Sequence, residues 1–234
     1  MNQKMLVIYY LTLSTIGAAL ILVVSRFSSS DTNTIHLFDR IVVGVVFISS
    51  CVFGISLAVR PNWIKRFTER KSHDMKKQQP QTKLRGRQGH HPDCERFERH
   101  TIKLKDKVLC AGCTGLALGS IASIFLMGVY ILLSNEIPPI VFNISIMLGM
   151  ILIALNYIET VIPTRKTLLH LISNIFLVIG FFFVVVGIFQ STGSVICGIF
   201  GVLISFLWLD TRIRLSSWQH TMICKDCSET CKVY

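Results

Sequence analysis

Residues 168–189 have the sequence LLHLISNIFLVIGFFFVVVGIF, which contains no Asp, Glu, Lys or Arg and only three polar side chains, His170, Ser173 and Asn174. About 20 consecutive, mainly apolar residues are enough for a helix to cross the hydrocarbon core of a bilayer. This stretch therefore predicts a transmembrane helix, and it sets the class of the whole protein.

The composition of the chain agrees with this assignment. The 234 residues are 51% hydrophobic and 16% charged, whereas soluble domains average about 45–50% apolar and about 25% charged residues. Leu168–Phe189 is one of six predicted spans, so the sequence predicts an all-α integral membrane protein. The first run is longer than a signal-peptide core and lacks a cleavage site, so we expect a retained helix. The other five predicted spans are Met5–Val24, Ile41–Val59, Leu109–Leu133, Pro139–Tyr157 and Thr192–Leu209.

The distribution of basic residues predicts the orientation of these spans. If the segments between spans alternate sides, all but two of the 24 Lys and Arg residues lie on the side that holds both termini, and the exceptions are Arg26 and Arg40. Basic segments stay in the cytoplasm. The sequence therefore predicts a plasma or inner membrane protein with both termini inside. All three tryptophans, Trp63, Trp208 and Trp218, are expected at cytoplasmic helix ends, where aromatic rings anchor at the interface.

This topology divides the chain into four parts. Residues 1–60 form a transmembrane helical hairpin, residues 61–108 a basic cytoplasmic loop with a Cys/His knuckle, residues 109–210 a four-helix transmembrane domain and residues 211–234 a cytoplasmic Cys-rich tail. The four parts place six of the eight cysteines in the cytoplasm, where thiols are kept reduced. Metal or redox chemistry is therefore favoured over structural disulfides.

Residues 90–115, HHPDCERFERHTIKLKDKVLCAGCTG, hold the densest group of potential metal ligands. The pair His91-x2-Cys94 is followed, after fifteen residues, by Cys110-x2-Cys113. This is the spacing of a zinc ribbon with histidine in place of the first cysteine, and a Cys3His set is common for structural zinc. Residues 101–109 alternate polar and apolar side chains around a Lys-Asp-Lys turn, which predicts a β-hairpin that brings the two pairs together. His90 and His100 are alternative ligands.

A second group of ligands lies in the tail. His220, Cys224, Cys227 and Cys231 follow one another at helical spacing. One straight helix cannot surround an ion with all four, so the sequence leaves open a second metal site or a site shared with the loop. The run C-x2-C-x3-C is also compatible with an iron–sulfur cluster. Zinc is favoured because nothing in the sequence marks an electron-transfer fold.

Two features of the spans themselves are relevant to the site. Ala111, Gly115 and Gly119 are four residues apart, which predicts a small-residue seam where another helix approaches closely. Polar side chains within spans are functional candidates, although those near span ends are also explained as interfacial residues. The polar residues in or near the fourth and fifth spans are Asn143, Asn156, Glu159, His170 and Asn174.

The motif H-P-x-C-E-R-F followed by C-A-x-C-T-G-L resembles the signature of a family of small prokaryotic multi-pass membrane proteins of unknown function. The matching positions cover about 30 residues and include the predicted ligands. Gly112 departs from the pattern, since many relatives carry Arg there. The resemblance implies a shared metal or thiol site and brings no activity with it. The matching residues are His90, His91, Cys94, Glu95, Arg96, Phe97, Cys110, Cys113, Thr114 and Gly115.

The sequence favours a non-enzymatic membrane protein in which a metal fixes the loop and presents a basic surface to anionic lipid or a cytoplasmic protein. A metal-dependent enzyme at the membrane face, using Asp93, Glu95, Arg96 or a spare histidine, is one alternative, but a closed Cys3His shell leaves no water position on the metal. A transporter or thiol-redox protein is the other. Nucleic acid is not expected as a partner, because the positive-inside bias already explains the charge of the loop.

Overall fold

The computed structural model describes residues 3–27, 35–59, 87–88, 101–104, 107–133, 139–162 and 166–225. Across these ranges, six helices are long and apolar enough to cross a membrane, so the chain is a multi-pass membrane protein. The six predicted spans are thereby confirmed, with bounds that differ by a few residues except at the last helix. The helices are α1 (Gln3–Phe27), α2 (Leu37–Val59), α4 (Ala111–Leu133), α5 (Pro139–Val161), α6 (Thr167–Thr192) and α7 (Val195–Lys225).

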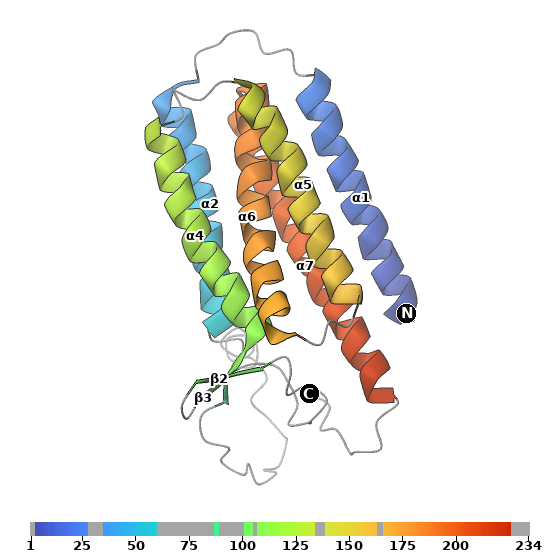
Figure 1. Ribbon diagram of the computed structural model, residues 1–234. Coiled ribbons are helices and arrows are strands. Elements are labelled where there is room, and N and C mark those ends of the chain that lie inside the picture. The colour runs from blue at the N-terminus through green and yellow to red at the C-terminus, as the bar shows by residue number, and fades with distance from the viewer. Residues whose placement is uncertain are drawn as a thin grey trace, which may run out of the picture.

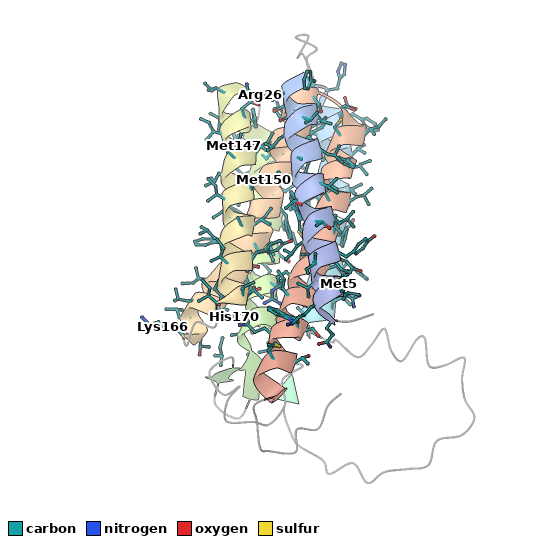
Figure 2. The ribbon with its side chains drawn as sticks, turned by 90° about the vertical axis from the view of Figure 1, so that its right-hand side faces the viewer. Met5, Arg26, Met147, Met150, Lys166 and His170 are labelled. Carbon is teal, nitrogen blue, oxygen red and sulfur yellow. The ribbon has the colours of Figure 1, made fainter. Side chains whose placement is uncertain are left out.

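The helices run up and down in one bundle (Figure 1). The start of α1, the small β-hairpin, the start of α4 and the end of α7 all lie at the same end of the bundle. Figure 2 shows Lys166 and His170 at this end and Arg26 at the opposite end. Successive helices in the described parts of the chain therefore run in opposite directions, as the predicted topology requires. Which side of a membrane each end faces stays a prediction.

Helix α6 is the centre of the bundle. In its most apolar window, 61% of the residues are buried inside the protein, compared with 22% for α1 and for α2. A helix that is apolar on all sides is typically enclosed by other helices, and α6 packs against α4, α5 and α7. Residues 168–189 thus belong to the core helix around which the others pack.

The contact between α4 and α6 uses the predicted small-residue seam. Ala111, Gly115 and Gly119 are all buried. A Cβ atom on Gly115 would lie 2.5 Å from the carbonyl oxygen of Leu171, and one on Gly119 would lie 2.9 Å from that of Ile175. The absence of side chains thus lets the two backbones touch, and the seam holds the first two turns of α4 directly against α6.

Helix α7 is longer than the predicted span, which ended at Leu209. It continues to Lys225, so the expected boundary between the membrane domain and the tail falls inside this helix. The reason is that Thr211 and Leu215 continue a buried face, with exposed fractions of 0% and 2%. Trp208 lies on the same face at 2% exposure, and its indole N–H donates to the carbonyl of Ser14. The prediction that Trp208 anchors at the lipid interface is therefore wrong.

The predicted hairpin is present in the described residues. Strands β2 (Thr101–Leu104) and β3 (Lys107–Cys110) pair antiparallel, and β1 (Arg87–Gln88) adds to β3 in parallel. In this register Thr101 lies opposite Cys110. Strand β3 passes directly into α4 at Ala111, so the hairpin is joined to the bundle without an intervening loop.

Candidate functional site

The junction between β3 and α4 holds the C-x2-C pair. Cys110 is the last residue of β3 and is buried, and Cys113 lies in the first turn of α4 and is half-buried. The Cys113 side chain hydrogen-bonds to that of Cys110. The hydroxyl of Thr114 donates to the carbonyl oxygen of Cys110 at 2.9 Å, which steadies the turn. The sequence-predicted second pair of ligands is thus held together with both sulfurs on the same side of the junction.

Gly112, between the two cysteines, leaves space for side chains from two other helices. A Cβ atom at this position would lie 3.1 Å from Nη2 of Arg212 and 3.1 Å from Nε2 of His170. The same Cβ would lie 3.8 Å from the sulfur of Cys110. The guanidinium of α7 and the imidazole of α6 therefore pack directly on the backbone of the C-x2-C turn, beside the thiols.

A chain of polar side chains connects α5, α6 and α7 at this point. Nδ1 of His170 lies 3.1 Å and 3.2 Å from the two carboxylate oxygens of Glu159. Nε2 of His170 lies 3.5 Å from Nη2 of Arg212, at the limit of hydrogen-bonding distance. With its proton on Nδ1, the imidazole donates to Glu159 and offers Nε2 to the guanidinium. The chain Glu159–His170–Arg212 thus ends at the cysteine pair.

Arg212 is the unusual member of this group. It is 8% exposed, and no described carboxylate lies within ion-pair distance of its guanidinium. Its Nε atom has no hydrogen-bond partner in the described part of the chain. The groups that act on it electrostatically are Cys110, Cys113 and Glu159. A buried charge is costly unless an opposite charge compensates it, and the groups beside the guanidinium that could carry one are the Cys110 thiol and, through His170, the carboxylate of Glu159.

Two asparagines support this region. Nδ2 of Asn174, which is fully buried, donates to the carbonyl oxygen of His170 at 2.5 Å. Asn156 is 1% exposed, and its Nδ2 donates to the hydroxyl of Ser173 at 2.8 Å. The polar residues singled out in the fourth and fifth spans therefore converge near the junction, with one exception: Asn143 pairs with Ser191, in the last turns of α6, at the other end of the bundle.

The predicted ligands are only partly covered by the structure. Cys110 and Cys113 are brought together, and His220 and Cys224 lie four residues apart in the sequence near the end of α7. Within the described ranges, no group of three or more His, Cys, Asp or Glu side chains is arranged to hold a metal ion. The remaining predicted ligands, His90, His91, Cys94, His100, Cys227 and Cys231, lie outside the described residues, so the full ligand sets stay predictions.

Sequence reasoning missed Arg212, because the last span was predicted to end at Leu209 and this arginine was counted with the tail. A signal was present. Trp208, Thr211, Arg212 and Leu215 have the i, i+3, i+4, i+7 spacing of one helical face. An arginine on the buried face of a continuing helix is a functional candidate.

No family model, curated protein or solved structure matches this chain. The resemblance to a membrane-protein family therefore stays a prediction, and the function must be argued from the geometry of the junction itself.

Proposed function

We propose that this multi-pass membrane protein holds a metal ion, with zinc favoured, at the junction of the β-hairpin and α4. Cys110 and Cys113 supply two thiolate ligands, and the sequence-predicted His91 and Cys94 supply the other two. The observation that carries the proposal is the pairing of Cys110 and Cys113 side by side at the β3–α4 turn. Two ligands separated by two residues on a tight turn are half of a closed tetrahedral site.

The hairpin register supports a contribution from the preceding segment. Thr101 lies opposite Cys110, and Cys94 precedes Thr101 by seven residues. A segment of this length spans at most about 23 Å, so Cys94 stays within reach of the thiols. A lone two-stranded hairpin is marginally stable, and a metal that joins its base to the segment before it would stabilise the loop.

The proposed role is structural. A closed four-ligand shell leaves no position for a catalytic water, so the centre fixes the loop of residues 61–108, which carries most of the basic residues of the chain. With this end of the bundle in the cytoplasm, as the positive-inside bias predicts, the loop is presented to anionic lipid headgroups or to a cytoplasmic protein.

Metal analysis of the full-length protein, purified in detergent, tests the proposal. We expect wild-type protein to carry zinc, and Cys110→Ser and Cys113→Ser to lose most of it. Cys51→Ser is the matched control, because Cys51 is buried in the middle of α2, remote from the junction. Zinc and iron are measured together, since iron with sulfide would identify a cluster instead. Wild-type protein without either metal, whose cytoplasmic cysteines all react with a thiol reagent, would refute the proposal.

The hydrogen bond between the side chains of Cys113 and Cys110 also favours one alternative, a thiol-redox function. In that case Cys110 and Cys113 together lose two protons and two electrons to a disulfide substrate, which is reduced to two thiols. Titration of the purified protein against glutathione redox buffers distinguishes the two functions. A reversible Cys110–Cys113 disulfide in metal-free protein supports the redox function, whereas thiols protected by bound zinc support the metal centre.

A further inference from the structure

Arg212 differs from an ordinary surface arginine, which is exposed to solvent. Its side chain is buried, its Nε atom has no hydrogen-bond partner and no carboxylate among the described residues lies within ion-pair distance. Arg214, two residues further along the same helix, provides the contrast. Its side chain is 44% exposed, lies 3.6 Å from Asp210 and covers the ring of Tyr10. Helix α7 therefore gives one arginine a carboxylate and an aromatic ring, whereas the other has no carboxylate within ion-pair distance among the described residues.

The direction in which Arg212 points indicates what compensates it. Its Nη2 atom packs against the Gly112 position, between the two cysteines, and the cysteine pair acts on its charge. A methyl group at residue 112 would crowd both the guanidinium and the imidazole at 3.1 Å. Gly112 thus leaves space for the guanidinium of Arg212 beside the thiols.

The position of the guanidinium is itself fixed. His170 is 8% exposed and is held by Glu159 through Nδ1 and by Asn174 through its carbonyl oxygen. Because the carboxylate on α5 holds the ring through Nδ1, the imidazole directs Nε2 at the guanidinium on α7. Groups that hold a metal site from outside its ligand shell commonly form such hydrogen-bonded chains.

We infer that Arg212 is a positioning residue of the centre: oriented by Glu159 and His170, its guanidinium supplies the positive charge that the thiolates of Cys110 and Cys113 require. This inference rests on the proposed metal centre. A zinc ion with three thiolates and one neutral imidazole carries one net negative charge, and Arg212 balances it. Arg212 has no carboxylate within ion-pair distance among the described residues, so its charge and that of the centre complement each other. Helix α7 thereby couples the bundle to the hairpin.

The test compares Arg212→Met, Arg212→Lys and Arg214→Met in the full-length protein. Zinc affinity is measured by competition with a chromophoric chelator, and Co²⁺ is used as a spectroscopic substitute that reports thiolate ligation. Loss of a group that supports a metal site from outside commonly weakens affinity by about 10–100-fold. We expect a loss of this size for Arg212→Met, a smaller loss for Arg212→Lys and none for Arg214→Met. Glu159→Gln should also weaken affinity, because it removes the carboxylate charge that holds the imidazole.

Thermal unfolding of the metal-free variants separates charge from packing. Arg212→Met removes a buried charge and places an apolar side chain of similar length, so we expect the metal-free bundle to keep its stability. Wild-type affinity in Arg212→Met would overturn the inference and leave the metal centre intact. Equal losses in Arg212→Met and Arg212→Lys, together with lower stability of the metal-free protein, would also overturn it, because packing would then explain the effect. Absence of metal from the wild-type protein would overturn both proposals.

Discussion

Gly115→Ala is the substitution whose effect the structure defines most sharply. A Cβ atom at this position would lie 2.5 Å from the carbonyl oxygen of Leu171 and 2.8 Å from Cβ of Asn174. Neither atom is the end of a flexible side chain, so α4 and α6 must move apart as a unit. An opening of about 0.9 Å would restore the 3.4 Å of ordinary van der Waals contact.

The cost of this opening follows from the packing of the seam. Inserting a methyl group into a tightly packed interface typically costs about 1–3 kcal/mol, and a contact with backbone belongs at the upper end. Alanine in place of glycine returns at most about 1 kcal/mol through helix propensity. We therefore expect a net loss of about 1–2 kcal/mol, which lowers Tm by roughly 3–6 °C in a chain of this size.

Thermal unfolding in detergent, followed by circular dichroism, measures this loss. Gly128→Ala is the matched control in the same helix, because a Cβ at Gly128 has no atom within 4 Å; we expect it to be neutral or slightly stabilising. Gly115 lies two residues after Cys113, so Gly115→Ala should also weaken zinc binding. If Gly115→Ala is as stable as Gly128→Ala, the close approach of α4 and α6 does not stabilise the bundle and the argument fails.

Three further predictions concern a contact between helices, the ligands of the metal and the orientation in the membrane. Ser14→Ala removes the 2.7 Å hydrogen bond to Thr211 that links α1 to α7; we expect a loss of about 0.6 kcal/mol in denaturant unfolding, and an unchanged midpoint would show that the bond contributes nothing. The shared-site hypothesis predicts that Cys224→Ala lowers the metal content; full content in this variant would confine the centre to the hairpin and the segment before it. In intact cells, a membrane-impermeant thiol reagent should label His36→Cys and not Lys166→Cys. These exposed residues immediately precede α2 and α6, which begin at opposite ends of the bundle, and the reverse pattern would contradict the predicted orientation.

The sequence predicted the features that depend on neighbouring residues. The six spans follow from local length and hydropathy, and the hairpin follows from the alternation between Thr101 and Leu109, because each is formed by residues close together in the chain. The seam at Ala111, Gly115 and Gly119 was also visible, since small residues four apart lie on one helical face. The sequence did not identify α6 as its partner, because any helix can pack against such a face.

The errors had a common origin. Trp208 was placed at the lipid interface and α7 was ended at Leu209, because a window that averages hydropathy falls where Asp210, Arg212 and Arg214 enter the chain. Averaging does not show which side of a helix carries each charge. Helix α7 continues because Arg214 faces outward while Arg212 lies on the buried face, a distinction that exists only once neighbouring helices are in place.

The sequence by itself determined that this is a membrane protein with six spans, a hairpin and a C-x2-C turn at the start of a tightly packed helix. Only the tertiary structure decided which side chains pack against that turn. His170 and Arg212 are 42 residues apart in the chain, and they meet at Gly112 because α4, α6 and α7 pack together at one end of the bundle. No local pattern encodes such a meeting, since it depends on which helix faces are buried against each other, and that is fixed by the packing of the whole bundle.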